Sequence, residues 1–349
     1  MRYASIILIL FVLSCRKEKP EEPQELSHLE NGIIVLCEGL FQQNNSSLFW
    51  IDLANSKVNN QFFLSQNQRQ LGDTGNDIER YGNKIYVVVN NSSTIEVLSV
   101  LNGRVLKTIE MSNNGQSKQP RSALGVGGKL YVTCYDGYVD VIDTSSFEIQ
   151  TRIPVGLNPE ELTLANDKIY VSNSGGLSFP NADSTVSVID PNQNVELSKI
   201  TVGLNPGPIV TDHEGDVYVV SRGDYVGVPS RMHKIDSQTD ELSQSFGFDA
   251  SILEAMNDQL IIGYTDFSGN GSSIGLFDAT TESMVNPTFI DASNMTVYRI
   301  TYSSSLSRIF VSDPLDFTTT GYLRSYDQSG APVDSYHVGL NPSEILIIE

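Results

Sequence analysis

Two short hydrophobic phrases recur along the chain in a fixed order. The first is an apolar, strand-like phrase of the "KIYV" type, and its seven copies begin at Gly32, Lys84, Lys129, Lys168, Asp216, Gln259 and Arg308. The second is an alternating phrase that closes on Asp or a substitute, and its seven copies end at positions 52, 99, 143, 190, 236, 278 and 327. These end positions are 47, 44, 47, 46, 42 and 49 residues apart. A period in the forties, without helical periodicity, is typical of four-stranded β-propeller blades.

The sequence therefore predicts an all-β fold, a seven-bladed β-propeller with four-stranded blades over residues 31–349. In the best-preserved unit, "EELTLAN", "DKIYVSN", "STVSVID" and "ELSKITVG" give the four strands from the inside outwards. The turn "VGLNP" at 155–159, 202–206 and 338–342 leads into a new inner strand, because Gly permits unusual backbone angles and Pro ends a hydrogen-bonded ladder. A β-sandwich would not repeat the same two phrases at constant spacing.

The last repeat is incomplete at the C-terminus. Only the inner-strand phrase "SEILIIE" follows the third "VGLNP", whereas the first apolar phrase, at 32–39, aligns with a second strand. We expect one blade to be built from both chain ends, with 343–349 inside and 32–64 supplying the other three strands. This arrangement closes the ring and removes an exposed strand edge. We also expect the Asp that ends each third strand to cap the following hairpin.

The first thirty residues have a different composition. An apolar run from Ile6 to Leu13 follows Arg2, and its length suits the core of a secretory signal but not a membrane span. The run ends in "VLSC", which resembles the lipobox of bacterial lipoproteins, so we predict a signal peptide over 1–15 and lipidation at Cys15. An ordinary signal peptide is the alternative. Residues 16–30 are charged and contain two prolines, which predicts a flexible tether.

Charge and cysteine content narrow the possible partners. Lys and Arg total 22 against 42 Asp and Glu, a net charge of −20 that repels phosphate backbones, so nucleic acid is not an expected partner. Two cysteines remain in the propeller, Cys37 and Cys134. Because they fall two blades apart, we expect two buried free thiols and no disulfide.

The long connections are predicted to share one face of the ring, where they follow the second strands or join one blade to the next. Six of the loops after second strands contain an aromatic residue among Asn and Ser. This composition favours a broad pocket for a large, uncharged, hydrogen-bonding ligand. In the alternative interpretation, each aromatic ring only covers the end of its own blade. The candidate ligand-binding residues are Phe41, Asn76, Arg121, Tyr135, Asn173, Phe179, Arg222, Tyr225, Phe267 and Phe317.

Signs of catalysis are scarce. The four histidines fall in the tether, in one turn and in strands of different blades, so they predict no metal site and no nucleophile–base pair. No Gly-rich phosphate loop precedes a helix. Loop carboxylates such as Asp183, Asp224, Asp266 and Asp316 are explained by the acidic surface. The sequence therefore predicts a protein that is not an enzyme and has no cofactor and no metal.

The lipobox, the tether and the segment "VGLNPEELTLANDKIYVSNSGG...STVSVID" together resemble the YncE-like seven-bladed propellers, and among these the surface lipoproteins of the BtuG kind. The resemblance implies a lipid-anchored outer-membrane protein, at the cell surface or on the periplasmic side. It also implies capture of cobalamin (vitamin B12), as a transported ligand, and its delivery to a TonB-dependent transporter of the BtuB type. Two alternatives stay open: an envelope propeller that binds a protein or a glycan, and a propeller lyase or lactonase.

Overall fold

The computed structural model describes residues 28–266 and 271–349. The predicted signal peptide, Cys15, most of the tether and Phe267 lie outside these residues. In the described part of the chain, no helix has the length and apolar character needed to cross a membrane.

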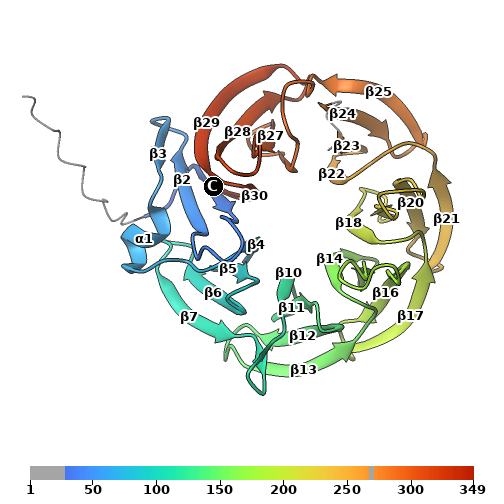
Figure 1. The fold of residues 1–349 in the computed structure, drawn as a ribbon, viewed down its shortest axis with the longest axis horizontal. Coiled ribbons are helices and arrows are strands. Elements are labelled where there is room, and N and C mark those ends of the chain that lie inside the picture. Colours follow the sequence, from blue (N-terminus) through green and yellow to red (C-terminus); the bar gives the residue numbers. More distant parts are fainter. Residues whose placement is uncertain (1–27, 267–270) are drawn as a thin grey trace, which may run out of the picture.

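Seven four-stranded antiparallel sheets surround a central axis, which confirms the predicted seven-bladed β-propeller (Figure 1). From inside to outside, blade 1 contains β30 (Pro342–Ile348), β1 (Gly32–Cys37), β2 (Ser47–Asp52) and β3 (Lys57–Asn59). Blade 2 contains β4 (Gly75–Tyr81), β5 (Lys84–Val89), β6 (Thr94–Ser99) and β7 (Val105–Glu110). Blade 3 contains β10 (Pro120–Val126), β11 (Lys129–Cys134), β12 (Tyr138–Asp143) and β13 (Ile149–Pro154).

The remaining four blades keep the same order. Blade 4 contains β14 (Pro159–Ala165), β15 (Lys168–Asn173), β16 (Thr185–Asp190) and β17 (Val195–Thr201). Blade 5 contains β18 (Pro206–Thr211), β19 (Val217–Ser221), β20 (Arg231–Asp236) and β21 (Glu241–Phe246). Blade 6 contains β22 (Ile252–Met256), β23 (Gln259–Asp266), β24 (Gly271–Asp278) and β25 (Ser283–Ile290). Blade 7 contains β26 (Arg299–Ser303), β27 (Arg308–Asp313), β28 (Thr320–Asp327) and β29 (Pro332–Leu340).

The two chain ends close the ring as the sequence predicts. Strand β30 pairs with β1 in one register from Gly32↔Ile348 to Leu36↔Glu344, and the register shifts by one residue before Cys37↔Pro342. The C-terminal strand is therefore the inner strand of the blade whose other strands come from the start of the domain. Strand β1 is therefore paired on both sides, and β30 takes the inner-edge position that the first strand has in the other six blades.

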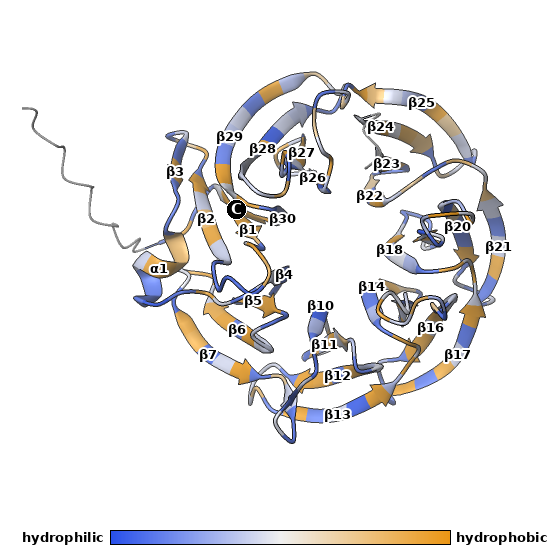
Figure 2. Ribbon diagram, in the orientation of Figure 1, coloured by the Kyte–Doolittle hydropathy of each residue, from blue (hydrophilic) through white to orange (hydrophobic). Residues whose placement is uncertain are grey.

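The core lies between neighbouring blades. Second and third strands bury nearly every residue, as in β15 and β16, whereas the outer strand β17 is mostly exposed. Figure 2 shows this as a mixture of hydrophilic and hydrophobic residues along the outer strands β13 and β17. Cys37 and Cys134 are free and buried, as predicted, and burial raises the pKa of Cys37 to about 12.

The predicted hairpin caps are present in every blade. In six blades the Asp that ends the third strand accepts a backbone N–H from two or three residues further on, and in blade 2 the Ser99 hydroxyl accepts that of Leu101 at 3.3 Å. The six are Asp52, Asp143, Asp190, Asp236, Asp278 and Asp327.

The segment after β3 departs from the prediction. Residues 62–64 were expected in a strand, but α1 (Phe62–Asn67) forms there, because Phe62 and its neighbour Phe63 are both buried and a strand would turn one of them outwards. The Phe62 ring lies 6.1 Å from that of Trp50. The connection to blade 3 also forms a small hairpin, β8 (Ser112–Asn113) with β9 (Gln116–Ser117).

Leu29 falls in the stretch that the sequence assigns to the tether. Its side chain is buried in the hydrophobic cluster between blades 1 and 2, and its backbone N–H donates to the Leu101 carbonyl at 2.7 Å. Packing against the propeller therefore begins at or before Leu29.

Candidate functional site

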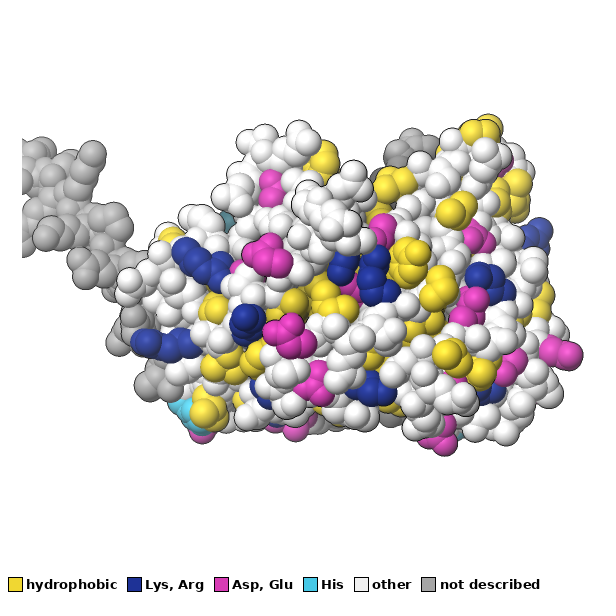
Figure 3. All heavy atoms as spheres, turned by 90° about the horizontal axis from the view of Figure 1, so that it is seen from below, with side chains coloured by type: hydrophobic (Ala, Val, Ile, Leu, Met, Phe, Trp, Pro, Cys, Tyr) yellow, Lys and Arg dark blue, Asp and Glu magenta, His cyan; other side chains and the backbone are white. Residues whose placement is uncertain are grey.

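The loops after second strands and the connections between blades share one face of the ring, because strand direction alternates within each blade. Figure 3 shows these loops standing above one side of the disc, with hydrophobic side chains on the raised loops at the right. A cavity of 1160 Å³ runs from this face along the axis and is lined by residues of all seven blades. Pockets for drug-sized molecules measure roughly 300–1,000 Å³, so this cavity suits a larger ligand.

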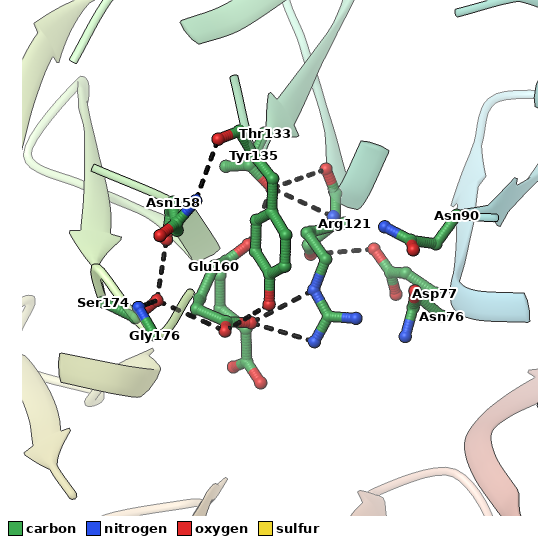
Figure 4. A network of polar contacts seen from close by, with 12 residues as sticks. Asn76, Asp77, Asn90, Arg121, Thr133, Tyr135, Asn158, Glu160, Ser174 and Gly176 are labelled. Carbon is green, nitrogen blue, oxygen red and sulfur yellow. Dashed lines mark hydrogen bonds and ion pairs between the residues drawn. The ribbon is translucent and has the colours of Figure 1, made fainter. Parts of the chain in front are cut away.

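The upper part of the cavity holds a charged network around Glu160 (Figure 4). The Arg121 guanidinium donates to Glu160 Oε2 from Nε at 3.2 Å and Nη2 at 3.0 Å, and the Tyr135 hydroxyl donates to Oε1 at 2.6 Å. Arg222 Nη1 lies 3.7 Å from the same Oε1. Burial opposes ionisation, but the guanidiniums of Arg121 and Arg222 hold the pKa of Glu160 below its usual value. Glu160 is therefore a carboxylate at neutral pH.

A second carboxyl group at this level behaves differently. Burial raises the pKa of Glu38, although Arg121 and the Tyr298 hydroxyl act in the opposite direction. That hydroxyl donates to Glu38 Oε1 at 2.9 Å.

The lower part of the cavity carries several carboxyl groups around one arginine. Arg299 lies 3.3 Å from Glu161 and 3.0 Å from Glu344. Burial raises the pKa of both Glu79 and Glu254 to about 7, and it also raises that of Glu344. Part of this acidic set therefore retains its protons near neutral pH.

The carboxyl groups of this lower set also have a structural role. Each inner strand is the edge of its sheet, so some of its backbone N–H groups have no partner within the blade. Glu79 Oε1 accepts the N–H of Gly125 at 3.0 Å, and Glu254 Oε1 accepts that of Tyr302 at 2.7 Å, each from the following blade. Asp77 does the same for blade 3. These side chains join neighbouring inner strands across the cavity wall.

Four of the ten candidate ligand-binding residues line the cavity: Asn76, Arg121, Arg222 and Tyr225. Asn76 and Arg121 lie in the inner strands β4 and β10, and Arg222 and Tyr225 lie in the loop between β19 and β20. Binding by any of them stays a prediction.

Five other candidates lie outside the cavity lining. Tyr135 stacks behind Arg121, with the guanidinium 4.9 Å from its ring. Phe41 is 65% exposed on the loop between β1 and β2, and Glu38 of the same loop lines the cavity whereas Phe41 does not. Asn173 is fully buried inside blade 4, where it bonds to Ser187 and to neighbouring backbone. Phe179 and Phe317 back the lining tyrosines Tyr225 and Tyr298, with ring centroids 6.1 Å and 5.4 Å apart.

Most of the polar and charged lining was not predicted from the sequence. Glu160 follows the turn proline Pro159 at the top of its inner strand. In the registers of blades 7 and 1, the aligned residues are Tyr298 and Ser343. The signal was available in the "NPEE" and "NPSE" phrases, because the residues after the turn proline face the axis. The loop lengths drew attention to the rim instead.

The structure also groups three carboxylates on the opposite face. Asp212, Glu214 and Asp216 have oxygens within 4.8 Å of one another in the turn between β18 and β19. Lys234 Nζ lies 2.9 Å from Asp216 Oδ2 and 2.7 Å from Glu282 Oε1, so one carboxylate of the group already has a cationic partner. The buried His233 bonds to Ser221 and Ser245, and burial lowers its pKa to about 4.

Several solved structures are similar to this chain in fold. A quinonprotein alcohol dehydrogenase-like protein from Bacteroides thetaiotaomicron aligns with a TM-score of 0.67 and 14% identity, over 91% of this chain and 78% of that one. Hydrazine synthase from Kuenenia stuttgartiensis aligns with a TM-score of 0.63 and 12% identity, over 77% of this chain and 88% of that one. The designed protein Ika8 aligns with a TM-score of 0.58 and 11% identity, over 91% of each chain. At these identities the likeness concerns the fold alone.

A search of curated protein sequences found no match to this chain. Residues 31–320 match the family described as "Domain of unknown function (DUF5074)", and the chain therefore belongs to that family.

Proposed function

We propose that this protein is a binding protein that captures a bulky, hydrogen-bonding nutrient in the axial cavity, and that cobalamin is this nutrient. The observation that carries the proposal is the cavity itself, with its 1160 Å³ and its lining from all seven blades. A flat corrin ring fringed with amide side chains needs both a large opening and many donors and acceptors. The resemblance to the BtuG kind of propeller supports the same ligand.

A binding role is also favoured over catalysis. The carboxyl groups of the cavity that an acid–base mechanism would use are held by backbone N–H groups or by arginine, as Glu79, Glu254 and Glu160 are. General acid–base work requires a group free to exchange a proton with the substrate. We therefore assign these groups to structure and recognition.

The proposed cellular setting rests on the sequence. Lipidation at Cys15 would anchor the protein in the outer membrane, and a TonB-dependent transporter of the BtuB type would receive the ligand. Replacing the acyl acceptor in Cys15→Ala should move the protein from the membrane fraction to the soluble fraction. An unchanged membrane fraction would contradict the anchor.

Isothermal titration of the protein with cyanocobalamin tests the ligand. Tyr225 lines the cavity and is 72% exposed, so Tyr225→Ala should weaken binding without unfolding the protein. Loss of one stacked aromatic ring corresponds to about 1 kcal/mol, or roughly fivefold in Kd. Phe41→Ala is the matched control, because Phe41 is an exposed aromatic residue on the same face but outside the cavity. No heat at micromolar protein would eliminate cobalamin.

A further inference from the structure

Blade 5 differs from the other blades at the position aligned with Glu160, the residue that follows the turn proline in blade 4. It has Gly207 there, and the Arg222 guanidinium lies over it: a Cβ added at Gly207 would be 2.3 Å from Arg222 Cζ and 2.5 Å from Nη1. The other six blades have a side chain at this position: Asn76, Arg121, Glu160, Ser251, Tyr298 and Ser343. The missing side chain of one blade thus leaves the space that Arg222 fills.

The guanidinium of Arg222 is little used by the protein. Among the described residues its charged partner is Glu160, at an Nη1–Oε1 distance of 3.7 Å, and its side chain donates no hydrogen bond within the criteria of a normal one. Arg222 lines the cavity, and 27% of its side chain is exposed. A guanidinium has five N–H donors, so most of these remain available to a ligand in the cavity.

The charge of Arg222 is also poorly balanced. Glu160 already receives two hydrogen bonds from Arg121 and one from the Tyr135 hydroxyl, which leaves little of its charge for Arg222. Glu38, the other carboxyl group at this level, accepts a hydrogen bond from the Tyr298 hydroxyl at 2.9 Å. Arg222 therefore has the longest ion-pair distance among the three guanidiniums that line the cavity, 3.7 Å to Glu160, against 3.0 Å for Arg121 and for Arg299.

We propose that Arg222, held over Gly207, binds an oxyanion of the captured ligand, a phosphate ester or a carboxylate. Arginine suits this role, because its planar fork matches two oxygens of such a group and its hydrogen bonds are charge-assisted. Arg299 of the lower cavity is already held by two carboxyl groups, Glu161 at 3.3 Å and Glu344 at 3.0 Å, so Arg222 is the guanidinium with donors to spare and sets the level at which the oxyanion binds. This inference rests on the proposed function; in cobalamin the group is the phosphodiester of the nucleotide arm.

The first experiment compares two ligands and two variants by isothermal titration. Cobinamide has the corrin ring and its amides but lacks the phosphodiester. Arg222→Gln should weaken cyanocobalamin binding by about ten- to a hundredfold, the range of one or two charge-assisted hydrogen bonds, and should affect cobinamide much less. Arg231→Gln removes the same charge from an exposed site of blade 5 outside the cavity lining and should change neither affinity. Equal weakening of both ligands by Arg222→Gln would overturn the oxyanion contact and leave the proposed function intact.

A second experiment does not depend on cobalamin. Phenylglyoxal modifies accessible guanidinium groups, and peptide mass spectrometry gives the modification rate at each arginine. Pyrophosphate or malonate should slow modification of Arg222 several-fold and leave Arg231 unaffected. Protection by pyrophosphate alone identifies a phosphate site, and protection by malonate alone identifies a carboxylate site. If neither anion protects Arg222, the inference is refuted, even when cyanocobalamin binds; if cyanocobalamin fails to bind but protection occurs, only the proposed ligand is wrong.

Discussion

One tyrosine contact between neighbouring blades allows a matched comparison within a single molecule. The Tyr131 hydroxyl lies 2.9 Å from the Pro191 carbonyl oxygen and 2.8 Å from Asn194 Oδ1, both in the hairpin turn of the following blade. Tyr86 is the same residue one blade earlier, and its buried hydroxyl has no hydrogen-bond partner in the described part of the chain. In the corresponding hairpin turn of blade 3, Phe147 occupies the position that Asn194 occupies in blade 4. The side-chain acceptor for the Tyr86 hydroxyl is therefore missing.

The expected magnitudes follow from these partners. Tyr131→Phe removes one hydrogen bond, but Lys129 Nζ still donates to Pro191 and Asn194 at 3.0 Å. The acceptors are therefore not stranded, and the loss is about 1 kcal/mol. Tyr86→Phe removes a buried hydroxyl without a partner, which is neutral or stabilises by up to about 1 kcal/mol. The two variants should differ by about 1–2 kcal/mol.

Urea denaturation followed by circular dichroism measures this difference, with thermal melting as a second readout. An unfolding entropy of about 2.1 cal/mol/K per residue over about 320 residues gives roughly 0.7 kcal/mol per degree. The variants should therefore differ in Tm by about 1.5–3 °C, with Tyr131→Phe the lower. If Tyr86→Phe loses as much stability as Tyr131→Phe, the Tyr86 hydroxyl has a partner and this explanation is wrong.

Three further predictions address ring closure, the pH dependence of stability, and the placement of Arg222 over Gly207. Ile348→Ala in the C-terminal strand should lower the free energy of unfolding by about 2–5 kcal/mol, because Ile348 is 2% exposed in the hydrophobic cluster between blades 1 and 2. In the same denaturation assay the control Val333→Ala, on an exposed outer strand, should change it by no more than about 0.5 kcal/mol. Burial raises the pKa of Glu79 from its usual value of 4.5 to about 7 in the folded protein, so the contribution of this group to stability falls as pH rises from about 4.5 to 7. Glu79→Gln should therefore flatten the plot of Tm against pH over that range. An unaltered slope would contradict the assignment. Gly207→Ala should displace the Arg222 side chain and reduce ligand affinity as Arg222→Gln does. The Tm should change little, because the displaced group is the end of a flexible side chain. Retained affinity would show that Gly207 does not position Arg222.

The parts of the fold that the sequence predicted are those enforced locally and then repeated. Each strand phrase shows the alternation of apolar and polar residues within its own few residues. Each closing Asp caps a turn within three residues, as Asp143 does with Ser145 and Ser146. Ring closure could also be predicted, because the C-terminus has an inner strand without a second strand and the start of the domain has a second strand without an inner strand. Helix α1 was missed since it occurs once and its two phenylalanines are buried by contacts with other strands.

The candidate site was harder to predict because its contacts join residues far apart in sequence. Tyr298 reaches Glu38 from the other end of the domain, and Arg299 reaches Glu161 across the axis from blade 7 to blade 4. No local pattern encodes such a pairing. Loop composition drew attention to Arg222 and Tyr225, which line the cavity, but it gave equal weight to Phe41, which does not.

The position after the turn proline is where we propose that the ligand specificity of this propeller is encoded. A ring of seven similar blades must keep the residues that pack one blade on the next, and the second strands keep them, as Tyr131 and Tyr86 illustrate. A ligand without sevenfold symmetry, however, needs a lining that differs from blade to blade. The lining has that property, since Glu160 gives way to Gly207 in the very next blade. In a repeat protein of this kind, the axis-facing positions where the repeat is least regular are therefore the ones to test for binding first.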